Sequence, residues 1–87
     1  MLPAEAIAAA AARHAVTPEA IEGRGRTGAV AAARAAVWCW LRARGWSYPE
    51  IGAAWGRDHT TIMSAVRKHG GAAPLVVGGA DAWMASG

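Results

Sequence analysis

Apolar positions recur with helical spacing over several stretches of this 87-residue chain. The longest stretch runs from Ala29 to Arg44, where apolar side chains return every three or four positions, and Gly45 can end the helix. Its apolar stripe contains Val30, Ala33, Val37, Trp40 and Leu41. Arg34 and Arg42 lie off this stripe. The pattern therefore predicts a helix that packs one face against a core.

Two shorter helices are predicted before it. Residues 3–15 are nearly all alanine, which is the strongest helix former. Thr17 can cap a second helix that has Pro18 at its first position and extends through Ile21. The glycines of residues 23–28 predict a loop. This loop lacks the GxxxxGK[ST] pattern of a phosphate-binding loop, so no nucleotide cofactor is expected.

Residues 47–68, SYPEIGAAWGRDHTTIMSAVRK, predict two short helices joined by a tight turn. Ser47 is a favourable N-cap, and Glu50 three positions later can complete a capping box. Gly56 allows the sharp turn that ends the first helix. Asp58 can then cap the second helix, where a negative charge is favourable.

The second of these helices has an apolar face and a polar face. The apolar face carries Ile62, Ala65, Val66 and His69. The polar face carries Thr60, Ser64, Arg67 and Lys68. Its N-terminal tip carries Arg57, Asp58, His59, Thr60 and Thr61, whose side chains have the chemistry to contact base edges in a major groove. Such a tip beyond a tight turn is typical of a DNA-binding helix-turn-helix, although two helices that merely pack together give the same pattern.

Charge is unevenly distributed along the chain. The formal net charge is +3, but residues 1–22 carry −2, residues 23–68 carry +6 and the remainder carries −1. A basic middle region suits a polyanionic partner. A solvated basic surface with no such partner remains the alternative.

Several other classes of protein are disfavoured. The N-terminus lacks the features of a secretory signal, and no apolar stretch is long enough to span a membrane. The single Cys39 suits a reducing cytoplasm and is expected to be a buried apolar residue. No histidine has metal-ligand spacing, so no metal is expected. We expect no enzyme, because no nucleophile–base pair or carboxylate pair is recognisable.

The segments SYPEIG, GRDHTT and AVRK closely resemble the C-terminal DNA-binding domain of the DnaA replication initiator family. The resemblance extends over roughly residues 4–69. It implies an all-α fold, a small helical bundle with a DnaA-type, Trp-repressor-like helix-turn-helix. One departure is that the family's paired glycines before the Arg-Asp-His become a single Gly56 after Trp55. The family's preferred DNA site is therefore not assumed for this chain.

The resemblance also implies roles for residues at the helix tip. Asp58, His59 and Thr60 are expected to contact bases, with Arg57 and Thr61 nearer the DNA backbone. The predicted DNA-binding set also includes Ser64 and Lys68 on the polar face of the same helix.

Further DNA contacts are implied outside that helix. Arg26 corresponds best to a loop arginine that enters the minor groove, and Arg24 is the alternative. Arg34 resembles a phosphate contact of the family. Tyr48 and Pro49 match a Leu-Pro pair beside the groove.

Residues 1–69 are thus expected to form the DNA-binding domain. The Gly/Ala-rich residues 70–87 are expected to be either flexible or partner-binding. The expected function is sequence-specific binding of double-stranded DNA in the cytoplasm, at the nucleoid. The favoured role is a transcription regulator of phage or gene-transfer-agent type, acting as a homodimer, with an attached domain, or with the transcription machinery. Two alternatives are a fragment of a replication initiator and a protein-interaction module that does not bind DNA.

Overall fold

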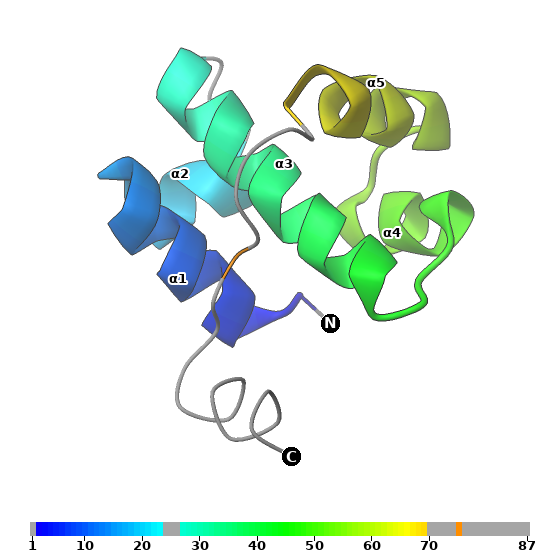
Figure 1. Cartoon of the computed structure of the whole chain (residues 1–87), viewed down its shortest axis with the longest axis horizontal. Coiled ribbons are helices and arrows are strands. Elements are labelled where there is room, and N and C mark those ends of the chain that lie inside the picture. The colour runs from blue at the N-terminus through cyan, green and yellow to red at the C-terminus, as the bar shows by residue number, and fades with distance from the viewer. Residues whose placement is uncertain (1, 24–26, 70–74, 76–87) are drawn as a thin grey trace.

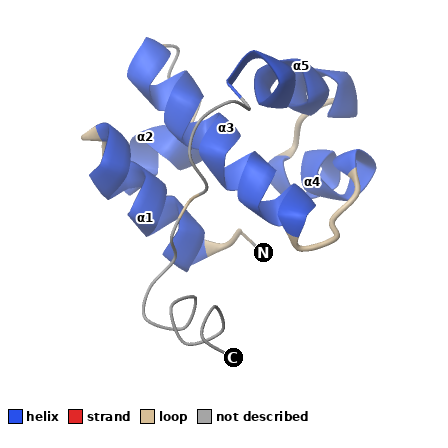
Figure 2. Cartoon of the chain, viewed as in Figure 1, coloured by secondary structure: helices blue, strands red, loops and turns tan. Residues whose placement is uncertain are grey.

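The computed structural model describes residues 2–23, 27–69 and 75. The described residues form five helices and contain no strand (Figure 1, Figure 2). The helices are α1 (Ala4–His14), α2 (Pro18–Glu22), α3 (Gly28–Ala43), α4 (Tyr48–Trp55) and α5 (His59–His69). The predicted all-α fold is therefore confirmed.

Helix α3 is the central element, because it packs against each of the other four helices. Helices α1 and α2 lie on one side of α3, and α4 and α5 lie on the other (Figure 1). Apolar side chains from all five helices meet in one core, which contains Ala6, Ile7, Ala10, Ala11, Ile21, Ala33, Val37, Trp38, Leu41, Ile51 and Ile62. Burial of these side chains orients the α4–α5 pair on the domain.

Local hydrogen bonds determine where the helices begin. The Oγ1 atom of Thr17 accepts from the backbone N–H of Ala20 at 3.1 Å at the start of α2. Thr27 caps α3 in the same way, and its Oγ1 accepts from Val30 at 3.3 Å. These bonds satisfy N–H groups that have no partner inside the helix.

The buried face of α3 differs from the predicted stripe. Trp38 is almost fully buried in the core, whereas Trp40 is only partly buried at its edge. Arg34 is buried as well, although the pattern had predicted it to lie off the packed face. The difference arises because α3 is enclosed by helices on two sides, so its buried surface is wider than a single stripe.

Little of the predicted tail can be compared with this fold. Within residues 70–87, only Leu75 is described, and its side chain packs against the core. The predictions for the rest of the tail lie outside the described residues, as do those for Arg24 and Arg26.

Candidate nucleic-acid interface

The turn between α4 and α5 is closed by backbone contacts. Gly56 ends α4 in the left-handed conformation, with φ of 64°. The N–H of Arg57 then donates to the carbonyl of Gly52 at 2.8 Å. The predicted capping box is present at the other end of α4, where Ser47 and Glu50 exchange hydrogen bonds of 2.8 and 3.2 Å. Both ends of α4 are therefore held by the residues that the sequence indicated.

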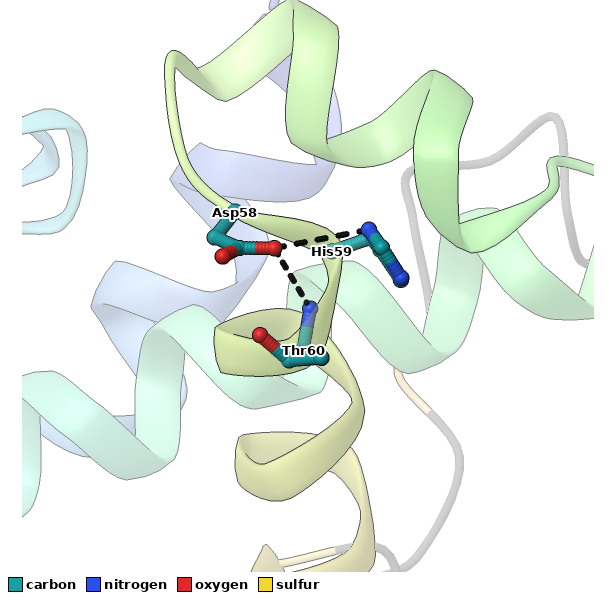
Figure 3. A network of polar contacts seen from close by, with 3 residues as sticks. All are labelled: Asp58, His59 and Thr60. Atoms are coloured by element: carbon teal, nitrogen blue, oxygen red, sulfur yellow. Dashed lines mark hydrogen bonds and ion pairs between the residues drawn. The ribbon is translucent and has the colours of Figure 1, made fainter.

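Asp58 organises the first turn of α5. Its Oδ1 atom accepts a hydrogen bond from the backbone N–H of Thr60 at 3.2 Å, and Nδ1 of His59 lies 3.4 Å from the same oxygen (Figure 3). The side chains of Asp58 and His59 are 65% and 52% exposed. The carboxylate thus caps the helix through one oxygen while the side chain faces solvent.

Hydrogen bonding stabilises the ionised form of Asp58. Bonds from Thr60, first through its backbone and then through its side chain, lower the pKa of Asp58, and the nearby His59 acts in the same direction. The tip of α5 therefore presents a carboxylate at neutral pH, and a carboxylate is a hydrogen-bond acceptor only. It can accept from a cytosine amino group but cannot donate to a base.

The polar face of α5 is exposed along the whole helix. Ile62 is fully buried against the core, with Ala65 and Val66 partly buried beside it. Beyond His59, the exposed side chains of α5 are those of Thr60, Thr61, Ser64, Arg67 and Lys68. Helix α5 is therefore anchored by its apolar face and offers its tip and polar face to a partner.

A second polar surface lies where α3 passes into α4. Tyr48 is partly buried and Pro49 is exposed, both in the first turn of α4. The guanidinium of Arg42 lies 4.5 Å from the centre of the Tyr48 ring. Arg42 also donates to the carbonyl of Trp46 at 2.8 Å. The contacts hold a cation beside Tyr48.

Arg42 was not among the predicted site residues. The available signal was a basic residue in the last turn of a helix, four positions before Trp46 and six before Tyr48. That spacing does not by itself bring the side chains together, because the turn between the two helices determines whether they meet.

Arg34, which was expected to be a phosphate contact, is instead buried in the structure. Arg34 is only 6% exposed. Its Nε donates to the carbonyl of Ile21 at 2.9 Å, and its Nη2 donates to the carbonyls of Ala20 and Gly23 at 3.1 and 2.9 Å. Burial lowers the pKa of Arg34, and the positive charge of Arg57 adds to this effect. The side chain of Arg34 therefore donates to backbone carbonyls at the C-terminal end of α2.

Arg57 is partly buried behind the exposed tip. Its Nη2 donates to the carbonyl of Gly23 at 2.7 Å, and its guanidinium lies 5.9 Å from the centre of the Trp38 ring. Among the predicted contact residues at the tip, Arg57 is thus the one that faces the body of the domain. The other four, Asp58, His59, Thr60 and Thr61, are exposed.

Among the described residues, no cluster of three or more His, Cys, Asp or Glu side chains is suitable for a metal ion. In the same part of the chain, no helix is both long and apolar enough to cross a membrane. Burial raises the pKa of the single Cys39 thiol, which keeps it protonated at neutral pH.

Comparison with known proteins gives two matches that agree with this geometry. Residues 3–68 match the family described as the bacterial DnaA protein helix-turn-helix. Over 59 residues the chain is 42% identical to the chromosomal replication initiator protein DnaA of Deinococcus radiodurans. This alignment includes 67% of the present chain but only 13% of that relative.

Proposed function

The chain belongs to the bacterial DnaA helix-turn-helix family, and on this premise we propose that it binds double-stranded DNA in a sequence-specific manner. The observation that carries the proposal is the exposed tip of α5, from Asp58 to Thr61, beyond a tight turn. In a helix-turn-helix, the second helix lies in the major groove and its N-terminal residues contact base edges. Helix α5 is that recognition helix.

Each exposed side chain of the tip has a distinct chemical role. Asp58 accepts a hydrogen bond from the exocyclic amino group of cytosine, using lone pairs that the cap leaves available. His59 and Thr60 hydrogen-bond base edges or contact the methyl group of thymine. Thr61 and Lys68 lie nearer the phosphates, as does Ser64 on the same face. These roles require exposure, and all six side chains are exposed.

Contacts outside α5 add affinity and extend the proposed binding to the minor groove. Arg26, or Arg24 in its place, enters the minor groove, where narrow A·T-rich sequences attract arginine. Tyr48 and Pro49 lie beside the backbone at the start of α4. Arg42, which stacks on Tyr48, is added to the proposed phosphate contacts. Phosphate contacts supply charge-dependent affinity, whereas base contacts supply specificity.

Selection of duplexes from a random pool at fixed salt tests the proposal directly. A specific binder enriches a defined motif of several base pairs, and the isolated motif then binds more tightly than scrambled duplex. Recovery of unselected sequences with equal affinity would argue against base recognition. Absence of any salt-dependent duplex binding would favour the alternative of a protein-interaction module.

Two biological roles fit this DNA-binding activity. A transcription regulator would bind sites distributed among promoters. The second role is that of the DNA-binding part of an initiator, and the resemblance to the replication initiator of Deinococcus radiodurans is consistent with it. Sequencing of genomic fragments bound by the protein distinguishes the two roles. An initiator would occupy a cluster of sites at one locus, whereas a transcription regulator would occupy scattered promoters.

Stoichiometry is part of the same proposal. One small helix-turn-helix makes few base contacts, so we propose that tight binding requires a second copy or an attached domain. Analytical ultracentrifugation with a single-site duplex measures how many copies of the chain bind one site. One copy bound tightly to one site would contradict it.

A further inference from the structure

One backbone carbonyl, that of Gly23, accepts hydrogen bonds from two arginines of different elements. The carbonyl oxygen of Gly23 accepts from Nη2 of Arg34 at 2.9 Å and from Nη2 of Arg57 at 2.7 Å. Gly23 is the residue after α2 and immediately precedes the basic segment 24–26. Arg57 immediately precedes Asp58, which caps the recognition helix. The contact therefore bridges elements that are 34 positions apart in the chain.

Arg34 is the first of the two arginines that donate to the Gly23 carbonyl. Its guanidinium donates to three carbonyls at the C-terminal end of α2, those of Ala20, Ile21 and Gly23. Carbonyls at a helix end lack partners inside the helix, and a cation is favourable there. Arg34 is almost fully buried. Replacing its guanidinium by water would therefore lose several charge-assisted hydrogen bonds to these carbonyls.

Arg57 links the same point to the helix-turn-helix. Its backbone N–H donates to the carbonyl of Gly52 in α4, and its side chain donates to Gly23. One residue thus contacts both α4 and the end of α2. Two guanidinium groups repel each other, and a carbonyl oxygen accepting from both offsets that repulsion.

We propose that Arg34 and Arg57 are positioning residues for DNA binding: by sharing the Gly23 carbonyl, they hold Gly23, the residue that precedes the basic segment in the sequence, at a fixed position relative to the recognition helix. This role rests on the proposed function. A duplex presents its two grooves at a fixed separation, so arginines from the segment 24–26 and side chains of α5 can act together only if their attachment points are held in register.

A lysine substitution separates this role from a phosphate contact. Lysine keeps the positive charge but lacks the planar guanidinium that donates to several acceptors at once. If Arg34 positions the segment, Arg34→Lys weakens duplex binding as much as Arg34→Met does. If Arg34 instead contacts phosphate, Arg34→Lys retains binding and only Arg34→Met lowers the salt dependence. The second result would overturn the proposal.

A double-mutant cycle tests whether the effect passes through the basic segment. Duplex affinity is measured by fluorescence anisotropy for the unmodified chain, Arg34→Lys, the pair Arg24→Ala with Arg26→Ala, and all three substitutions together. We expect Arg34→Lys to weaken binding about tenfold alone and less than about twofold when both loop arginines are already absent. A general loss of stability would give the same factor in both backgrounds, and that result would also overturn the proposal.

Two controls complete the experiment. Arg13→Lys makes the same chemical change at an exposed position of α1 and should leave the affinity unchanged. Circular dichroism establishes that each variant is folded at the assay temperature. If Arg34→Lys does not fold, Arg57→Lys is carried through the same cycle, where equal loss in both backgrounds again contradicts the bridge. If the unmodified chain binds no duplex, the proposed function fails first, and this role fails with it.

Discussion

The backbone N–H of Arg57 donates to the carbonyl of Gly52 at 2.8 Å, and this approach leaves no space for a side chain on Gly52. A Cβ atom at Gly52 would lie 2.6 Å from the carbonyl oxygen of Arg57 and 3.3 Å from the backbone nitrogen of His59. Both neighbours are backbone atoms and cannot rotate away. The separation of α4 and α5 therefore depends on glycine at this position.

The substitution Gly52→Ala should consequently destabilise the domain. Overpacking of this kind costs about 1–3 kcal/mol, and each 1 kcal/mol lowers the Tm of a domain this small by roughly 4–8 °C. Thermal unfolding followed by circular dichroism measures the shift. Gly28→Ala is the matched control, because a Cβ atom there meets no atom within 4 Å and alanine is the better helix former. Equal Tm values for both variants would contradict the close approach.

The substitution His59→Ala should reduce specificity rather than general affinity. His59 is exposed at the tip of α5, where its ring can contact base edges. We expect a loss of about 1–3 kcal/mol on the selected site and little change on random duplex. Anisotropy titrations with both duplexes at one salt concentration provide the comparison. An equal loss on both would refute base recognition by His59.

The substitution Lys68→Ala should weaken binding to all duplexes alike. Lys68 is exposed in the last turn of α5 and is proposed to contact phosphate. Loss of one phosphate contact reduces the slope of log K against log salt by about 0.9 on duplex DNA. Arg13→Ala removes the same charge from α1, on the opposite side of α3 from α5, and should leave the slope unchanged (Figure 1). A slope that Lys68→Ala does not alter would remove Lys68 from the interface.

Stability should decrease in acid through the capping box of α4. Hydrogen bonds from Ser47, first its backbone and then its side chain, lower the pKa of Glu50 below the ordinary value of 4.5. A carboxyl group whose pKa is lower in the folded state stabilises the fold fully above that ordinary value, and the contribution is lost as pH falls through the folded value. The Tm should therefore begin to fall below about pH 4.5.

The variant Glu50→Gln isolates this contribution, because glutamine can keep the box geometry but does not titrate. Its Tm should fall less steeply with acid than that of the unmodified chain. Thermal unfolding at a series of pH values from neutral to acid gives both curves. If the two curves run parallel through the acid range, Glu50 makes no pH-dependent contribution to stability.

Much of the local structure followed from the sequence alone. The capping box of Ser47 and Glu50 and the cap at Asp58 were predicted correctly, and so was the sharp turn at Gly56. Each depends on residues within three positions of one another, so spacing along the chain determines whether the atoms can meet. The exposed tip of α5 follows from the same logic, because Ile62 fixes which face of a short helix is buried.

Tertiary packing decided the roles of three other side chains. Trp38 rather than Trp40 fills the core, since successive helix positions differ by about 100° and the placement of neighbouring helices selects between them. Arg34 is buried because carbonyls 11 to 14 positions earlier in the chain lie within its reach. Arg42 meets Tyr48 only through the turn after α3. Local pattern specifies helices and their caps, but long-range contacts decide whether a cation faces solvent or the protein, because only the folded chain brings its acceptors together.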